Sequence, residues 1–342
     1  MVLAKRAKMN PRALAESIRE RFEGKGICAA LEIAGAGFLN FRLDSQWVRA
    51  RVEAMRDDPR LAVPEPTVKK KIIVDFSSPN VAKPMHVGHI RSTIIGDSLC
   101  RIARFLGFSV IADNHIGDWG TQFGKVIYGW KHFLDREALE KDAIAELVRL
   151  YREVTRLEET DEDIKRTARE ELVKLQAGDA ENLALWHKII AISASAFTEI
   201  YRLLDIHFDH QLGESFYNDK LPQVYTELTA AQLAAESQGA LVVFHDDHPR
   251  FSRNAERPNP FMVRKADGAS GYASTDLATA LYRSEHFGAD GIVIVTDFRQ
   301  SDHFEQLFLT VRRWFAAKGH RLPALHHVTF GAVTGEDGKA LK

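Results

Sequence analysis

The chain has 342 residues, of which 45% are hydrophobic and 27% are charged, and its 46 basic residues nearly balance 47 acidic ones. This composition predicts a globular protein of about two domains, and the net charge of -1 shows no overall basic excess of the kind that indicates a nucleic-acid partner. Only Cys28 and Cys100 are present, and neither a signal peptide nor a membrane span is apparent, so we expect a cytoplasmic protein without disulfides, cysteine-bound zinc or membrane contact.

Residues 1–58 are predicted to form a small α/β domain. A helix is expected to begin at Pro11, because apolar side chains follow it at helical spacing. In residues 38–43, Phe38, Asn40 and Arg42 alternate with Leu39, Phe41 and Leu43, and this period of two is typical of a strand. The next segment, residues 59–71, combines three prolines with a lysine run, and we interpret it as a linker.

Residues 72–342 alternate between strand and helix patterns, which predicts an α/β domain with a Rossmann-like, mostly parallel sheet covered on both faces. A charged, amphipathic stretch at about 131–238 interrupts the alternation, and we interpret it as a helical insertion. The expected strands are 72–76, 110–112, 241–244, 261–263, 291–296 and 327–330. The expected helices outside the insertion are 88–105, 275–286 and 302–317.

The stretch IIVDFSSPNVAKPMHVGHIRST, residues 72–93, places two histidines where the first strand of this sheet passes into its helix. Ligands bind at the carboxyl ends of strands in such sheets, and the first turn of a helix attracts anions. His86 and His89 can donate hydrogen bonds to phosphate oxygens, and Gly88 lets a phosphate or a flat ring approach the backbone closely. The pattern is neither a P-loop nor a dinucleotide fingerprint, and it predicts a nucleotide site for displacement at phosphorus.

Two other interpretations of the histidine pair remain open from the residues alone. A metal site would need a third ligand, for which only His115 or Asp118 lies nearby in the sequence. Alternatively, both histidines cap the helix or pack in the core. Chemistry therefore favours a nucleotide without excluding the other two.

Two longer runs carry a more specific signal. VDFSSPNVAKPMHVGHIRST at 74–93 and DNHIGDWGTQFG at 113–124 together resemble the arginyl-tRNA synthetases, class I enzymes whose first signature is His-Ile-Gly-His, with valine here in place of isoleucine. The resemblance extends over nearly the whole chain, including the strand AGAGFLNFRL. It implies a class I catalytic Rossmann domain over 72–342 and a partial tRNA-contacting domain over 1–58.

The resemblance also implies an arginine site at the carboxyl edge of the sheet. A guanidinium binds a carboxylate through two parallel hydrogen bonds, and Asp276, with Tyr272 four residues before it, suits that geometry. The residues that match the family's arginine-binding positions are Ser78, Pro79, Asn80, His89, Tyr272, Asp276 and Gln300. Taken alone, Asp276 could equally be a helix N-terminal charge, Tyr272 a packing residue and Gln300 a loop residue.

The same resemblance assigns ATP binding to His86, Gly88 and His89, and catalysis to the two histidines together with Lys83. Lys83 would replace the lysine of the second class I signature, Lys-Met-Ser-Lys-Ser, which this sequence does not contain. Asp75, in the strand before the histidines, is interpreted as a weaker candidate with a structural role.

The implied reaction is the activation of L-arginine by ATP, bound with Mg²⁺, to arginyl-adenylate, followed by transfer to tRNA(Arg). Neither a covalent nucleophile, a tightly bound cofactor nor a resident metal is expected, and the family implies a monomer. The run GEDGKALK, residues 335–342, falls where the family enters its second signature, so the resemblance implies a fragment without the anticodon-binding domain and with impaired aminoacylation. The alternatives are a non-catalytic synthetase-like binding module or pseudogene product, and a metal-dependent hydrolase.

Overall fold

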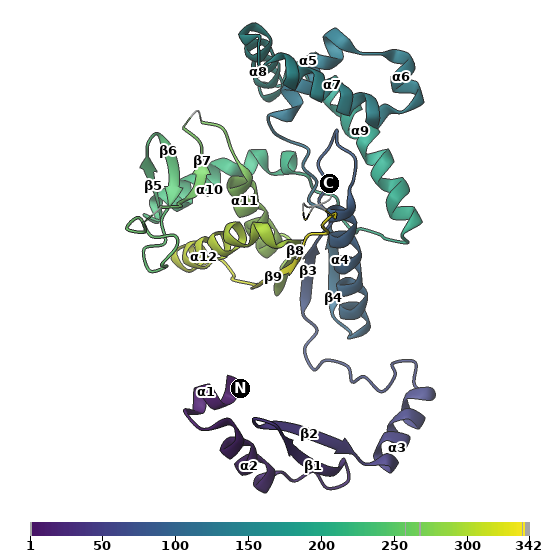
Figure 1. Cartoon of the computed structure of the whole chain (residues 1–342). Coiled ribbons are helices and arrows are strands. Elements are labelled where there is room, and N and C mark those ends of the chain that lie inside the picture. The colour runs from purple at the N-terminus through teal and green to yellow at the C-terminus, as the bar shows by residue number, and fades with distance from the viewer. Residues whose placement is uncertain (1, 257, 267, 337, 339–342) are drawn as a thin grey trace. The chain divides into compact units, whose positions relative to one another are not determined.

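The structure is a computed structural model that describes residues 2–256, 258–266, 268–336 and 338. The run 335–342 is expected to fall where the family enters its second signature, and residues 337 and 339–342 of that run lie outside the described residues. The chain divides into two compact units, Met1–Pro66 and Thr67–Lys342, and each is described here by itself (Figure 1).

The first unit is a small α/β domain. Its elements are α1 (Val2–Ala7), α2 (Pro11–Arg21), β1 (Cys28–Ala34), β2 (Phe38–Leu43) and α3 (Ser45–Arg56). The predicted start of α2 is confirmed: the side chain of Asn10 accepts from the N–H of Arg12 at 2.9 Å, and proline occupies the first helical position. The strands β1 and β2 form an antiparallel hairpin. Helix α3 lies where the sequence pattern predicts no element; Asp44 caps it through two backbone N–H groups.

The second unit is built on a four-stranded parallel sheet in the order β4-β3-β8-β9, which confirms the predicted Rossmann-like class. The strands are β3 (Lys71–Asp75), β4 (Ser109–Asp113), β8 (Gly291–Asp297) and β9 (Ala324–Phe330). The covering helices are α4 (Val87–Phe105), α11 (Tyr272–Glu285) and α12 (Ser301–Lys318). The pair β3–β4 is joined through α4 and the pair β8–β9 through α12, as parallel crossovers require.

Opposite faces of the sheet bury different partners. Ile73 and Ile292 pack in one cluster with side chains of α11 and α12, whereas Val74 and Val295 pack with Cys100 of α4. Alternate residues of a strand point to opposite faces, so neighbours 73 and 74 separate in this way. The sheet is thus covered on both sides, and its carboxyl edge is left to the loops that follow each strand.

One part of the strand prediction is wrong. The predicted strands at 241–244 and 261–263 exist, but they form a separate antiparallel sheet, β5-β6-β7, and do not join the parallel one. The strands are β5 (Ala234–Ser237), β6 (Ala240–Val243) and β7 (Phe261–Arg264). The cause is the two-residue turn Gln238–Gly239, whose φ angles of 51° and 79° join β5 to β6 as a tight hairpin and so fix antiparallel pairing.

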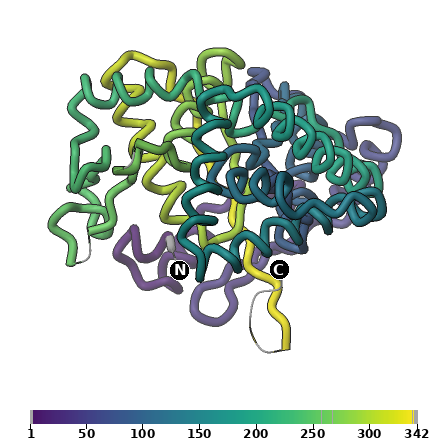
Figure 2. Tube along the Cα trace, turned by 90° about the horizontal axis from the view of Figure 1, so that it is seen from above, coloured from purple at the N-terminus to yellow at the C-terminus, as the bar shows by residue number. Residues whose placement is uncertain are grey.

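Between β4 and β5 the chain is mostly helical. The elements are α5 (Gln122–Phe133), α6 (Arg136–Lys141), α7 (Ala143–Leu157), α8 (Glu162–Gln176), α9 (Ala180–Leu203), the 3₁₀-helix η1 (Glu214–Lys220) and α10 (Leu221–Ala230). Figures 1 and 2 both show α5, α7, α8 and α9 gathered as one group. Phe123, Ile127, Leu147 and Trp186 are buried together in the core of this group.

Among the described helices, α9 is one that is long and apolar enough to cross a membrane by length and composition alone. Such a single helix is weak support for a membrane span, because the core helix of a soluble domain passes the same test. Here Trp186, Ile189, Phe197 and Tyr201 of α9 are buried against the rest of the unit.

Candidate functional site

The residues predicted for the site lie in the loops at the carboxyl edge of the parallel sheet and at the starts of the helices beside it. The loop after β3 carries Ser78, Pro79 and Asn80, and α4 begins just after His86. Tyr272 opens α11, whereas Gln300 ends the 3₁₀-helix η2 (Phe298–Gln300) after β8. This edge is where doubly wound sheets bind their ligands.

The loop after β3 has an unusual backbone that is held in place by hydrogen bonds. Ser77 and Ser78 have positive φ angles of 72° and 46°, which L-residues rarely adopt. The N–H of Ser78 donates to Oδ1 of Asn114 at 3.0 Å, and the hydroxyl of Ser77 lies 2.7 Å from that of Tyr201. Backbone strain of this kind persists where surrounding contacts enforce it, and it is common at ligand sites.

The next residues of the loop are fixed to the loop after β4. Gly117 donates its N–H to the carbonyl of Pro79 at 3.0 Å, and Val81 donates to the carbonyl of Gly117 at 3.0 Å. A side chain at 117 would meet Oδ1 of Asn80 at 2.4 Å, so glycine is required for this close approach. The Ser-Pro-Asn segment is therefore rigidly placed beside the DNHIGD run.

His86 and His89 cap α4 reciprocally. Nδ1 of His86 accepts from the N–H of Gly88 at 3.1 Å, while the N–H of His86 donates to Nδ1 of His89 at 3.2 Å. Each Nδ1 is an acceptor, so in each neutral ring the proton is on Nε2. Burial, and then the charge of His86, lower the pKa of His89 to about 4, so that ring is neutral at pH 7.

This geometry accounts for both the capping and the nucleotide interpretation of the pair. The two rings are tilted by 37° with centroids 3.9 Å apart, and their Nε2–H groups are the donors from which phosphate oxygens could accept. The metal interpretation gains no support, since the described residues include no group of three His, Cys, Asp or Glu side chains that could hold an ion.

A hollow open to solvent adjoins the start of α4. It is lined by His86, Val87, Gly88, Arg91, Asp297, Arg299, Phe330, Gly331, Ala332 and Val333. The guanidinium of Arg91 lies 5.3 Å from the centre of the Phe330 ring, and Nε of Arg299 is 2.8 Å from Asp297. Arg91 and the helix N-terminus favour an anion in this hollow, whereas the charge of Arg299 is offset by Asp297, which also lines it.

The second half of the site is a pair of carboxylates. Asp276, near the start of α11, has Oδ2 at 2.5 Å from Nε2 of His303 and Oδ1 at 4.0 Å from Nε2 of His115. Glu214, the first residue of η1, is 9% exposed. Burial, and then the charges of Asp276 and Asp118, raise the pKa of Glu214 to about 8. Within the described residues, neither Glu214 nor Asp276 forms an ion pair with a lysine or an arginine.

Glu214 is a residue that the sequence analysis missed. It lies in the run HQLGESFYND, which has neither helical nor strand periodicity, and 62 positions separate 214 from 276 along the chain. Tyr272 opens the same helix as Asp276 and is 69% exposed. Partial burial of its ring, and then the charges of Glu214 and Asp276, raise the pKa of Tyr272, so the three groups interact electrostatically.

Two predicted residues have no described interaction with this cluster. Gln300 is exposed, and Nζ of Lys83 lies 5.3 Å from the centre of the Tyr151 ring in α7. Among the described interactions, none joins Lys83 or Gln300 to the histidines or to Asp276. Their assigned roles therefore stay predictions.

Asp75 has a clear structural partner. The guanidinium of Arg283, in α11, lies 2.7 Å from Asp75 and 2.8 Å from Asp113, and all three side chains are buried. Burial lowers the pKa of Arg283, but the charges of Asp75 and Asp113 outweigh it and raise the pKa, so the guanidinium stays charged. This ion cluster ties α11 to the ends of β3 and β4 and so positions Asp276 two turns earlier on the same helix.

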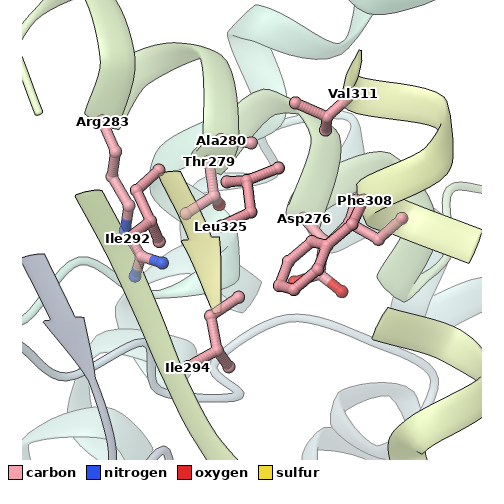
Figure 3. A pocket seen from close by; sticks show the side chains of 10 residues that line it. Asp276, Thr279, Ala280, Arg283, Ile292, Ile294, Phe308, Val311 and Leu325 are labelled. Carbon is pink, nitrogen blue, oxygen red and sulfur yellow. The ribbon is translucent and has the colours of Figure 1, made fainter. Parts of the chain in front are cut away.

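Figure 3 shows Asp276, Thr279 and Arg283 beside a narrow pocket between α11, α12 and the sheet. The remaining lining is aliphatic or aromatic: Ala280, Ile292, Ile294, Leu307, Phe308, Val311 and Leu325. Asp276 is the one carboxylate in this lining, and the guanidinium of Arg283, which also lines it, disfavours a further cation. We therefore regard this pocket as packing behind the site.

A parallel sheet with a histidine-capped helix at its carboxyl edge fits the catalytic domain of the class I aminoacyl-tRNA synthetases. The family described as tRNA synthetases class I (R), catalytic domain, matches residues 52–342, and the Arginyl tRNA synthetase N terminal domain matches residues 1–43. The chain therefore belongs to the arginyl-tRNA synthetase family, which confirms the resemblance of its motifs.

Individual relatives agree with this. The chain is 43% identical over 344 residues to the arginine–tRNA ligase of Cyanothece sp., covering 99% of this chain and 57% of that protein. It is 41% identical over 331 residues to that of Fusobacterium nucleatum, covering 96% of this chain and 55% of the relative. The chain thus spans between half and two thirds of the length of these relatives.

The fold is also similar to solved structures of arginyl-tRNA synthetases. The arginyl-tRNA synthetase of Plasmodium falciparum superposes with a TM-score of 0.71 at 30% identity, covering 96% of this chain and 56% of that one. The Thermus thermophilus arginyl-tRNA synthetase superposes with a TM-score of 0.69, covering 99% of this chain and 61% of that one; at 21% identity this likeness supports the fold alone.

Proposed function

We propose that this chain carries the arginine-activating site of an arginine–tRNA ligase. In this proposal L-arginine reacts with ATP to give arginyl-adenylate and pyrophosphate, and the arginyl group is then transferred to tRNA(Arg). The protein would act as a cytoplasmic monomer, with Mg²⁺ entering as part of the ATP substrate. The observation that carries the proposal is that the carboxylates Glu214 and Asp276 form no ion pair with a lysine or an arginine among the described residues, although Glu214 is buried.

The carboxylate pair would bind the guanidinium end of arginine. A planar guanidinium offers five N–H donors in a fixed arrangement, and two carboxylates can accept most of them, whereas lysine offers a single ammonium. Burial of Glu214 strengthens this preference, because an unpaired charge there is costly and a cation relieves the cost. Tyr272, at the exposed rim, would pack over or hydrogen-bond the guanidinium.

The α-carbon end of arginine would lie toward the loop after β3. In this arrangement Ser78, Pro79 and Asn80 form one wall, because their backbone is held in place by the loop after β4. His89 and Gln300 would orient the α-amino and α-carboxylate groups. Fixing both ends of the substrate brings its carboxylate to the phosphorus in a reactive orientation, which is the main contribution such a site makes.

ATP would occupy the hollow at the start of α4. Gly88 leaves room for the nucleotide, since a side chain there would come within 3.0 Å of the His86 ring. The arginine carboxylate oxygen attacks the α-phosphorus, the bond to the bridging oxygen breaks, and pyrophosphate leaves with the electron pair. The Nε2–H groups of His86 and His89 would stabilise the charge that develops on the phosphate oxygens. Lys83 would stabilise pyrophosphate after leaving its position over Tyr151.

Arginine-dependent exchange of pyrophosphate into ATP, measured with and without tRNA(Arg), tests the proposal. We expect exchange with arginine and none with citrulline, which has the same shape without the charge. Calorimetry with arginine alone separates the alternatives: binding without exchange would favour a non-catalytic binding module. The proposal fails if arginine binds no better than citrulline.

A further inference from the structure

We propose that His303 is a positioning residue that holds Asp276 so that one carboxylate oxygen faces the guanidinium of the substrate. The inference rests on the proposed function, since it concerns how the arginine site is oriented. His303 lies in the first turn of α12, and its Nε2 is 2.5 Å from Oδ2 of Asp276. An ionised carboxylate only accepts hydrogen bonds, so the proton of this bond is on Nε2 of His303.

The other oxygen of Asp276 has a different neighbour. Nε2 of His115 is 4.0 Å from Oδ1 of Asp276, beyond hydrogen-bond distance, while Nδ1 of His115 is 3.1 Å from the carbonyl of Leu212. A carbonyl also only accepts, so Nδ1 of a neutral His115 carries the proton and its Nε2 has none to donate. Oδ1 is therefore the oxygen that an N–H of a bound guanidinium can reach without displacing a protein donor.

The ring of His303 is fixed by contacts outside the site. Its centroid lies 5.6 Å from the ring of Phe261 in β7 and 5.0 Å from that of Phe304. The residues on either side of it are tied to the loop between β6 and β7: Arg250 is 2.5 Å from Asp302, and His248 is 3.2 Å from Glu305. The position of the Asp276 carboxylate thus depends on a histidine whose own place is set by α12, β7 and this loop.

A carboxylate free to rotate about its terminal bond would lose entropy on binding arginine, and one already fixed loses less. Removing the Nε2–H should therefore weaken arginine binding and leave ATP binding unchanged. Glutamine is the conservative replacement, because its side-chain amide N–H₂ can take the place of Nε2–H. Leucine fills a similar volume without any donor.

The test measures the arginine Kd and the KM values for arginine and ATP in the exchange assay. We expect His303→Leu to raise the arginine Kd about 10- to 100-fold, the arginine KM in parallel, and the ATP KM less than about twofold. His303→Gln should recover most of the lost affinity. His207→Leu is the matched control, because its ring belongs to an exposed pair with Asp205 at 3.7 Å and should change neither constant.

An unchanged arginine Kd in His303→Leu would overturn the inference, as would equal losses of arginine and ATP affinity in the leucine and glutamine variants. A second measurement covers the case in which His303→Leu does not fold. The wild-type chain should show a low-field Nε2–H resonance of His303 by NMR, and this resonance should disappear in Asp276→Ala; its absence from the wild type would also overturn the inference. If the wild-type chain fails to bind arginine at all, the proposed function fails, whereas a failure confined to the variants concerns His303 alone.

Discussion

Helix α11 connects two carboxylate pairs, one of which is bridged by an arginine of the protein and one of which is not. Asp75 and Asp113 are bridged by Arg283, whose guanidinium lies 2.7 and 2.8 Å from them. Glu214 and Asp276 also lie in a largely buried place, but no described arginine or lysine pairs with them. The protein thus contains one guanidinium bound in its core, and in the proposed function the pair two turns away along α11 takes its guanidinium from the substrate.

The difference between the pairs has an energetic consequence. In the first pair the guanidinium of Arg283 offsets part of the negative charge, and the cluster fixes α11 against β3 and β4. In the second pair burial, and then repulsion by the charges of Asp276 and Asp118, raises the pKa of Glu214 to about 8. A binding site of this kind reduces the stability of the free protein, and the ligand restores it.

The largest effect is expected from removing the internal guanidinium. Arg283→Leu would leave Asp75 and Asp113 buried and uncompensated, so we expect a loss of about 3–5 kcal/mol in the free energy of unfolding, measured by urea denaturation. Arg166→Leu is the control, because Arg166 pairs with Asp163 on the surface at 2.8 Å and should change stability by less than about 0.5 kcal/mol. Equal losses in the two variants would mean that the core cluster has no special role.

A smaller effect is expected in the second pair, on binding. Asp276→Asn keeps the size of the side chain but removes its charge, and we expect arginine binding to weaken by about 2–4 kcal/mol in calorimetry. Asp163→Asn, at an exposed position, should leave the affinity unchanged. If Asp276→Asn binds arginine as the wild type does, Asp276 is not in the arginine site.

The third effect concerns stability and should have the opposite sign. The pKa of Glu214 is raised to about 8 in the folded protein, whereas an unfolded glutamate has a pKa of about 4.5. Between these values the folded state binds more protons than the unfolded state, so this contribution to stability is lost as pH rises toward 8. Glu214→Gln removes the cost, and we expect it to raise the free energy of unfolding by about 2–3 kcal/mol above pH 8.

The pH dependence distinguishes this cause from a simple packing effect. The gain in stability from Glu214→Gln should shrink as pH falls from 8 toward 4.5. In this range Glu214 is protonated, and so as neutral as glutamine, in the folded state, and it becomes increasingly protonated in the unfolded state. Denaturation curves at several pH values measure it. A gain that is constant with pH would show that the pKa of Glu214 is not raised.

Local sequence patterns were sufficient to predict one part of the candidate site. The strand that ends at Asp75, the histidines that cap α4, and Tyr272 with Asp276 at the start of α11 are all close together in the sequence, so spacing and motif predict them. Capping by His86 and His89 is also a local effect of the first helical turn.

The rest depends on contacts between distant residues. Arg283 and Asp113 are 170 positions apart, and no pattern near either of them indicates the other. Glu214 lies in a stretch without periodicity and becomes notable only beside Asp276. Strand pairing is likewise a long-range property: the turn at Gln238–Gly239 removes β6 from the parallel sheet although its composition would suit either sheet.

The smallest effect is a proton released when arginine binds. At pH 7 Glu214 is mostly protonated in the free protein, and a guanidinium beside it stabilises the ionised form, so binding should release about one proton. Affinity should therefore rise with pH, by up to tenfold or about 1.4 kcal/mol per unit, and level off above about 8. Calorimetry at pH 7 in buffers of different ionisation enthalpy counts the protons directly. Glu214→Gln should abolish the release, and a wild-type protein that binds arginine without releasing a proton would mean that Glu214 does not meet the guanidinium.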